Sequence, residues 1–334
     1  MRLSLCMIVK DEENMLEECL ALARPHVDEI VIVDTGSSDR TPEIIERYAD
    51  RGAEFAWRDD FAAARNYAIS QASGDWLLVL DADERIESKG FDVLREEITQ
   101  APLKALALEV RDYSDDALQP DWLPLKEPTP YARAMRGYVA MPVLRLFRRD
   151  AGLSFRGRIH ELVTPPDGPG SLGHSAAIIH HYHDADPSKP QHERQAHYLR
   201  ILEEELKQRP EGRLHVAAGI ACMYHVHNYP RAVWHYEQAL AQGYHPEKTQ
   251  EGLAEALYRA GELEAARVQY EALMDAGYRS LAACLNLANL SVKSGQSAKA
   301  LEYLQLARER CPVGTSLHHT IDHNIRHLKA RQGA

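Results

Sequence analysis

The residues best suited to chemistry are three carboxylates that follow an apolar run in the stretch GDWLLVLDADE, Gly74 to Glu84. Asp81 and Asp83 are one residue apart, and Glu84 comes directly after Asp83. Like charges this close are unfavourable unless a positive partner lies among them. Paired carboxylates suit hard divalent cations such as Mg²⁺ or Mn²⁺, which in turn bind diphosphate oxygens. The alternative is that the carboxylates are simply solvated at the end of a strand.

The elements that must position these carboxylates are short apolar runs that alternate with helical patterns. The runs LSLCMIVK, EIVIVD and DWLLVLD are predicted to be strands. Strands that are apolar on both faces and alternate with helices indicate an α/β fold with a mostly parallel sheet, covered on both sides. Ligands bind such sheets beyond the carboxyl ends of the strands. Four aspartates lie at or just past these ends: Asp11, Asp34, Asp60 and Asp81.

The overall composition narrows the class of protein. The 334 residues exceed what one hydrophobic core usually serves, so two domains are expected. A formal net charge of −11 argues against nucleic acid as a partner. Five cysteines without a CxxC pair, and no signal peptide, indicate a cytoplasmic protein. No apolar run approaches the roughly 20 residues that span a bilayer, so any membrane association would be peripheral, at the inner face.

The C-terminal part becomes helical from about Arg194 and contains an internal repeat. Three similar motifs begin 34 residues apart, at Asn228, Glu262 and Gln296. A 34-residue helix–turn–helix unit resembles the tetratricopeptide repeat. We expect repeats at about 213–246, 247–280 and 281–314, followed by a capping helix.

Four motifs of the N-terminal part occur in a characteristic order: SLCMIVKDEENML, EIVIVDTGSSDRT, DDFAAARNYAI and GDWLLVLDADE. Together they resemble family 2 glycosyltransferases of the GT-A fold, and more narrowly the bacterial members with tetratricopeptide repeats behind the catalytic domain. The resemblance implies a GT-A domain over 1–190 and a helical repeat domain over 191–334. It also implies an inverting transfer of a sugar from a nucleotide sugar, usually UDP-linked. The implied cofactor is a divalent metal, Mn²⁺ or Mg²⁺, at the DxD motif.

The resemblance further implies which residues bind the donor and the metal. The residues expected to contact the base, the ribose or the nucleotide end of the donor are Val9, Asp11, Asp34, Arg65, Asn66 and Asp81. Asp83 is expected to ligate the metal directly, with Asp81 facing both ribose and metal. Two plainer alternatives stand beside these roles. Arg65 would be a surface helix arginine, and Asp34 a turn aspartate that satisfies the Gly36–Ser38 loop.

The catalytic base of an inverting transfer is expected in GRIHELV. If this segment is a strand, His160 and Glu161 point to opposite faces, so only one of them enters the site. We expect Glu161 to be the base or to bind the acceptor, with His160 as the alternative. A plain salt bridge from Glu161 to Arg156 or Arg158 would explain the residue without catalysis.

The segment IIHHYHD is expected to supply a metal-site histidine. In the family this region carries a His-Tyr pair near the metal and diphosphate, which His181 and Tyr182 match. His183 stands where the family usually has glycine. Strand alternation places His181 and His183 on one face and His180 on the other. One metal-site histidine with two structural ones is therefore expected, rather than a three-histidine zinc site.

Two other classes of protein remain as alternatives. A nucleotidyltransferase normally opens with a glycine-rich phosphate loop, whereas CMIVKDEEN has no glycine. A repeat scaffold that binds a peptide partner would have an inactive α/β half. The acceptor stays open between a hydroxyl or thiol of a peptide or protein and that of a glycan or glycolipid. The repeats would bind this acceptor or a partner, or serve self-association, and the segment 113–140 would shape the sugar pocket.

Overall fold

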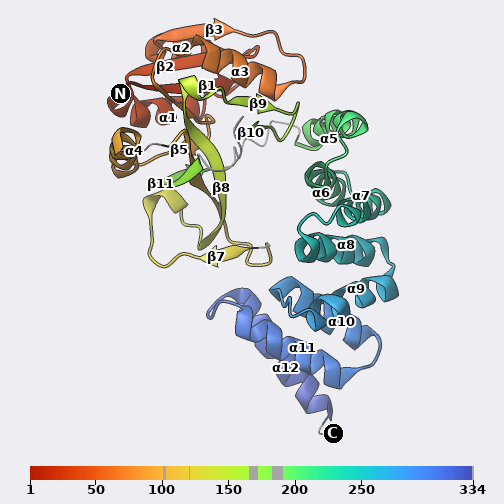
Figure 1. Ribbon diagram of the computed structural model, residues 1–334. Coiled ribbons are helices and arrows are strands. Elements are labelled where there is room, and N and C mark those ends of the chain that lie inside the picture. The colour runs from red at the N-terminus through yellow and green to blue at the C-terminus, as the bar shows by residue number, and fades with distance from the viewer. Residues whose placement is uncertain (101–102, 120, 165–171, 183–190, 333–334) are drawn as a thin grey trace. The chain divides into compact units, whose positions relative to one another are not determined.

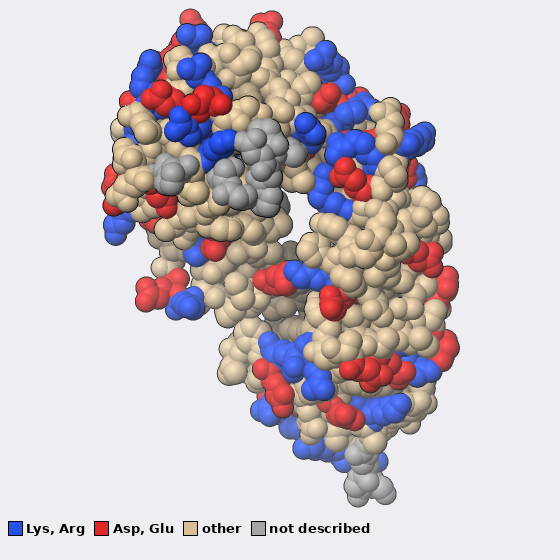
Figure 2. All heavy atoms as spheres, in the orientation of Figure 1, with Lys and Arg blue, Asp and Glu red and all other residues tan. Residues whose placement is uncertain are grey.

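The computed structural model describes residues 1–100, 103–119, 121–164, 172–182 and 191–332 (Figure 1). The chain separates into two compact units, one formed by 1–115 with 125–188 and the other by 116–124 with 189–334. The predicted boundary at 190/191 lies at the end of a segment outside the described residues. None of the described helices is both long and apolar enough to cross a membrane. On the face that Figure 2 shows, basic and acidic side chains are interspersed.

The first unit is built on a mixed, mostly parallel sheet. Its strands are β1 (Leu3–Val9), β2 (Glu29–Asp34), β3 (Arg51–Glu54), β4 (Trp76–Val79), β5 (Glu84–Arg85), β6 (Ala105–Ser114), β8 (Gly137–Arg148) and β11 (Leu172–His181). They are ordered β3-β2-β1-β4-β8-β6-β11-β5. β1 is parallel to β2 and β4, β2 to β3, and β6 to β11. β8 runs antiparallel to β4 and β6, and β5 runs antiparallel to β11.

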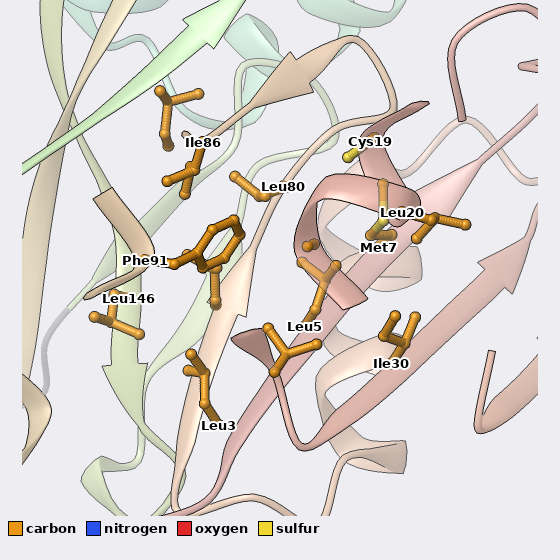
Figure 3. Close-up of a cluster of buried hydrophobic side chains, with 14 of the residues drawn as sticks. Leu3, Leu5, Met7, Cys19, Leu20, Ile30, Leu80, Ile86, Phe91 and Leu146 are labelled. Atoms are coloured by element: carbon orange, nitrogen blue, oxygen red, sulfur yellow. The ribbon is translucent and has the colours of Figure 1, made fainter. Parts of the chain in front are cut away.

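Helices cover both faces of this sheet because its strands are apolar on both sides. The helices are α1 (Leu16–Ala23), α2 (Thr41–Tyr48), α3 (Phe61–Gln71) and α4 (Ser88–Gln100). Leu3, Leu5 and Met7 share one core with buried residues of α1, α2 and α4, part of which Figure 3 shows. Cys6 belongs to a second core with Ala62 of α3. The predicted α/β class with a covered sheet is therefore confirmed.

The parallel strands bring the ends of β1, β2 and β4 to one edge of the sheet. Val9 is in register with Asp34, so β1 and β2 end side by side. β4 is parallel to β1 and ends at Val79, shortly before Asp81. The loops that follow these strands carry the predicted aspartates. Asp60 serves a different purpose, because its carboxylate caps the N-terminus of α3.

Two segments of the chain have more complex structures than a single strand or a plain loop. The strand predicted across LSFRGRIHELV is an antiparallel hairpin of β9 (Ser154–Arg156) and β10 (Leu162–Thr164). Gly157 and His160 turn the chain between them with φ of 105° and 49°. The proline-rich segment 121–142 contains β7 (Trp122–Pro124), a 3₁₀ turn at Pro130–Ala132 and the first half of β8.

The second unit consists mainly of helices. They are α5 (Gln191–Gln208), α6 (Gly212–Ile220) with a π-helical extension at Ala221–His225, α7 (Tyr229–Ala241), α8 (Pro246–Ala260), α9 (Leu263–Asp275), α10 (Leu281–Lys293), α11 (Ser297–Arg310) and α12 (Ser316–Gln332). Gly261 and Gly295 turn the chain between paired helices in the left-handed region, with φ of 86° and 71°.

The helical hairpins repeat with the predicted spacing. α7, α9 and α11 begin 34 residues apart. Ala232, Ala266 and Ala300 occupy the same position in these helices and are each fully buried, so the helices pack closely there. The second unit therefore has the tetratricopeptide-type architecture that the sequence predicts.

Candidate active site

An ion-pair network surrounds Asp81 at the edge of the sheet. Arg65 of α3 donates from Nη2 to Asp81 Oδ1 at 2.8 Å, and Arg145 of β8 donates from Nη2 to Asp81 Oδ2 at 3.1 Å. Arg65 also donates from Nε to Glu161 Oε1 at 2.5 Å. Arg145 also donates to Glu84 Oε1 at 2.6 Å. Two arginines thus connect two carboxylates of the DxD turn, Asp81 and Glu84, with Glu161, which lies far from them in sequence.

The turn that carries the DxD motif differs from the predicted strand. β4 ends at Val79, and Glu84 N–H donates to Asp81 O at 3.0 Å, which closes a turn. Asp81 and Asp83 therefore do not share a strand face. Strand alternation would turn the Glu84 side chain away from those of Asp81 and Asp83, but the turn brings it inward. Glu84 is only 2% exposed, and its carboxylate accepts from Asp81 N–H and Arg145 inside the turn.

The arginines explain how three carboxylates lie close together. Burial raises the pKa of Asp81, but Arg65 and Arg145 outweigh burial and hold that pKa below its usual range. Burial, opposed mainly by Arg145, raises the pKa of Glu84 to about 7. The positive partner that the carboxylates require is thus supplied, at Asp81 and Glu84, by guanidinium groups of the chain itself.

Asp83 lies beside a histidine rather than an arginine. His181 Nε2 is 3.4 Å from Asp83 Oδ2, and His181 Nδ1 is 3.5 Å from Asp112 Oδ1 on the neighbouring strand β6. Burial lowers the pKa of His181, but the two carboxylates outweigh burial and raise it to about 10. All three side chains are about one quarter exposed. This cluster is therefore open to a ligand in solution.

Asp81, Asp83 and His181 are the side chains of this site that could ligate a divalent cation. Among the described residues, no three His, Cys, Asp or Glu side chains form a ready-made metal cage. Mg²⁺ is usually held by only one or two carboxylates, with substrate phosphates and water completing its shell. Asp83 fits that pattern as the carboxylate, and His181 beside it can join the shell only as a neutral imidazole. Both oxygens of Asp81 accept from arginines, so Asp81 fits direct metal ligation less well.

The loops after β1 and β2 hold each other in place. Asp34 Oδ1 accepts from Gly36 N–H, Ser37 N–H and Ser37 Oγ–H. Through this oxygen, Asp34 satisfies the loop that follows it, as the turn alternative predicts. Asp11 Oδ1 accepts from Ser38 N–H at 2.7 Å. Val9 is buried, and its carbonyl accepts from the backbone N–H of the residue after Asp34. Their contacts with a base and ribose remain predictions.

Arg65, Asn66 and Glu161 are brought together by α3 and the β9–β10 hairpin. Arg65 is 7% exposed, so the surface alternative for this residue is wrong. The side-chain amide of Asn66 forms two hydrogen bonds of 2.9 Å with the backbone of Phe155: Nδ2 donates to the carbonyl, and Oδ1 accepts from the N–H. These bonds fix the hairpin to α3. Its role toward the nucleotide remains a prediction. Glu161 forms an ion pair with Arg65.

The two predicted base candidates lie in different surroundings. Glu161 follows the hairpin turn, and its side chain is mostly buried against Arg65, which links it to Asp81. The adjacent residue His160 is exposed and has a left-handed backbone conformation. Turn geometry, rather than strand alternation, therefore separates these two side chains.

The histidines of β11 also have separate partners. His180 is buried, and its Nδ1 is 2.6 Å from the hydroxyl of Tyr113. Burial, assisted by Arg111, lowers the pKa of His180 to about 4. His180 is thus a packed residue, whereas His181 lies beside Asp83. The prediction for His183 falls outside the described residues.

Sequence reasoning missed Arg145 and Asp112. Both lie on strands whose residues face the site only through long-range pairing, β8 with β4 and β6 with β11. In VLRLFRRD, alternation would set Arg145 apart from Leu144 and Leu146, which was the available signal. No local pattern indicates that this strand pairs with the one that precedes the DxD turn.

The N-terminal unit can now be assigned to a family. Residues 4–151 match the family model described as Glycosyl transferase family 2. The chain therefore carries a family 2 glycosyltransferase domain at its N-terminus, followed by tetratricopeptide-type helices.

Several known proteins are similar to parts of this chain. A TPR repeat-containing protein of Synechococcus elongatus is 41% identical over 162 residues, 48% of this chain and 35% of that protein. The SPbeta prophage-derived glycosyltransferase SunS of Bacillus subtilis is 27% identical over 158 residues, 46% of this chain and 33% of that protein. The lipopolysaccharide core biosynthesis glycosyltransferase LpsC of Rhizobium meliloti is 28% identical over 191 residues, 53% of this chain and 62% of that protein.

The aligned segments are partial on both sides. The chain spans about a third of the length of the first two relatives. Among solved structures, YrrB, described as a TPR protein with an unusual peptide-binding site, is similar at a TM-score of 0.36 and 15% identity. The similar region covers 42% of this chain and 71% of the YrrB chain. A likeness this low adds nothing to the fold description.

Proposed function

We propose that this protein is an inverting, metal-dependent glycosyltransferase that transfers a sugar from a nucleotide sugar to an acceptor hydroxyl or thiol. The observation that carries the proposal is the linked set Glu161–Arg65–Asp81, next to the Asp83–His181 pair, at the carboxyl edge of the sheet. This edge is where α/β sheets bind ligands. The family match over residues 4–151 supports sugar transfer as the reaction class.

The metal part of the proposal assigns Asp83 and His181 as the residues that would hold Mn²⁺ or Mg²⁺. A bound divalent cation would supply charge neutralisation to the diphosphate leaving group. Arg65 and Arg145 fix the carboxylate of Asp81 between them, and we expect Asp81 to face the ribose of the donor. UDP is the nucleotide we expect, from the family resemblance.

The acceptor part of the proposal rests on Glu161. An inverting transfer requires a base that removes the acceptor proton as the acceptor attacks the anomeric carbon. Glu161 is placed by its bond to Arg65, and the same arginine is bonded to Asp81 on the donor side. One guanidinium therefore sets the position of both carboxylates. His160, exposed beside Glu161, is the weaker candidate for this role.

The helical unit is proposed to bind the acceptor or a partner. Tandem helical hairpins provide extended surfaces that recognise other chains. Two relatives have names that state glycosyltransferase, and one of these states lipopolysaccharide core biosynthesis. We therefore propose that the acceptor is a peptide, a protein or a glycan. We also propose that the enzyme is cytoplasmic and can work at the inner face of the membrane.

The test is nucleotide release from a panel of nucleotide sugars with Mn²⁺, with and without chelator. We expect slow, metal-dependent hydrolysis of at least one UDP-sugar. Asp83→Asn should abolish this metal-dependent hydrolysis. Asp150→Asn is the matched control, because Asp150 lies on the surface and pairs with Arg148 there. No binding or release with any donor would refute the enzyme and favour a repeat scaffold.

A second experiment examines the base. Glu161→Gln should lower the rate of transfer by roughly 10²–10⁴-fold, the usual contribution of a general base, and leave UDP binding intact. His160→Gln should change the rate much less. If the two variants behave in the reverse way, the assignment of Glu161 is wrong.

A further inference from the structure

A short segment before β8 has a backbone that its own sequence does not favour. The 3₁₀ turn Pro130–Ala132 is followed by Arg133 and Ala134, with φ of 46° and 71°. Two consecutive residues other than glycine in the left-handed region are uncommon. Such conformations persist when surrounding contacts hold them, and they concentrate at functional sites.

The first of these contacts is a ring stack on β11. Tyr131 lies on His180 with ring centroids 4.2 Å apart and planes within 12° of parallel. His180 is itself buried and held by the hydroxyl of Tyr113 at 2.6 Å. The segment is thus fixed to one neighbour of His181.

The second contact is made by Arg133. Its guanidinium lies over the ring of Tyr182, 4.0 Å from the centroid. Tyr182 is the other neighbour of His181, and its N–H donates to Asp83 O at 2.9 Å. The segment therefore contacts both residues that flank His181, and the second of these is bonded to the DxD turn.

Arg133 is also linked to the DxD turn through Glu18 and Arg85. Its Nη2 donates to Glu18 Oε2 at 3.0 Å, and the same oxygen accepts from Arg85 Nη2 at 3.2 Å. Arg85 is 1% exposed and donates from Nη1 to Ala82 O at 2.6 Å and Glu84 O at 2.8 Å. These two carbonyls flank Asp83, so Arg85 shapes the backbone that presents its carboxylate.

We propose that Tyr131 and Arg133 are positioning residues that hold His181 and the Asp83 turn in the geometry needed to bind a metal–nucleoside diphosphate. Neither residue has to touch the donor. The effect on donor binding rests on the proposed function, whereas the effect on the turn does not. The two parts can therefore be measured separately.

The structural part is tested by hydrogen exchange of the full chain without ligand. Tyr131→Ala and Arg133→Ala should speed exchange of the Tyr182 and Glu84 amides by about three- to tenfold, as expected for losing one ring or cation–π contact. Arg136→Ala is the matched control, because Arg136 follows in the same segment and its side chain bonds exposed Asp115. Unchanged exchange in both test variants would overturn the proposal.

Conservative variants keep the test valid if the alanine variants unfold. Tyr131→Phe retains the stack and should exchange as the wild type does. Arg133→Lys retains a charge toward Glu18 but not the flat guanidinium over Tyr182, so it should exchange at an intermediate rate. Wild-type exchange in Arg133→Lys, or fast exchange in Tyr131→Phe, would contradict the proposed contacts.

The functional part uses Mn²⁺ with UDP as the probe, measured by calorimetry. The alanine variants should bind it about three- to tenfold more weakly, and KM for the donor should rise more than kcat falls. Faster exchange with unchanged Mn²⁺–UDP affinity would overturn the functional part. If wild type binds no nucleotide but exchange still responds, the proposed function fails and the structural part stands.

Discussion

Replacing Arg145 by methionine tests whether the ion-pair network is held together by charge. In the structure, Arg145 is the bridge between Asp81 and Glu84. Removing it takes away the guanidinium that pairs with the carboxylate of Glu84, a residue only 2% exposed. Asp81 is affected less, because it keeps Arg65 and its side chain is 31% exposed.

The expected loss of stability follows from the burial of Glu84. Breaking a buried ion pair by removing one partner costs about 3–5 kcal/mol. Because Asp81 keeps a partner and Glu84 can take up a proton, we expect the lower end, about 3 kcal/mol. For a unit of this size, that corresponds to a fall in melting temperature of roughly 6–12 °C. The assay is calorimetry of the full chain.

A double variant separates loss of charge balance from loss of packing. Glu84→Gln in the Arg145→Met background removes the unpaired carboxylate, so it should restore a large part of the stability. Arg148→Ala, on the same strand but at the surface, should leave the melting temperature unchanged. If the double variant is as unstable as Arg145→Met alone, the electrostatic reasoning is refuted.

Three further outcomes are expected elsewhere in the chain. Asn66→Ala should destabilise the first unit by about 1–3 kcal/mol in denaturant unfolding, because the backbone of β9 loses two hydrogen bonds; an unchanged midpoint would contradict this. Burial lowers the pKa of His215, and burial, opposed by Glu203, lowers that of His235, whose Nδ1 is 3.1 Å from His215 Nδ1. The unfolded chain therefore binds protons at a higher pH than the folded chain, so stability should be full above about pH 6.5 and fall below it. In thermal scans, His215→Asn should weaken this dependence of the melting temperature on pH. Equal dependence in the variant and the wild type would speak against the reasoning. Gly252→Ala should lower the melting temperature of the helical unit, since a Cβ would lie 2.6 Å from the Tyr236 ring, an overpacking cost of about 1–3 kcal/mol.

The sequence predicted the elements better than the contacts between them. Apolar runs such as LSLCMIVK are confirmed as β1, because burial on both faces leaves a clear pattern. The 34-residue period is confirmed in the starts of α7, α9 and α11, because stacked hairpins repeat the same buried positions. These features depend on neighbours in sequence, which a single chain shows directly.

The site could be predicted only in part, because its geometry depends on turns and long-range pairs. Glu161 pairs with a residue 96 positions earlier, which no local pattern predicts. Strand alternation does not hold at Asp81–Glu84 or at His160–Glu161, because both segments are turns in the structure. Arg145 was missed because its role depends on the pairing of β8 with β4.

The regular spacing of the helical hairpins has a consequence for how such chains can change. In a stack of like units, each hairpin packs on the next, so a whole unit added or removed leaves the same kind of surface exposed. Length changes of 34 residues are therefore the ones this unit should accept at lowest cost. Insertions of other lengths would have to be placed in the turns, such as those at Gly261 and Gly295.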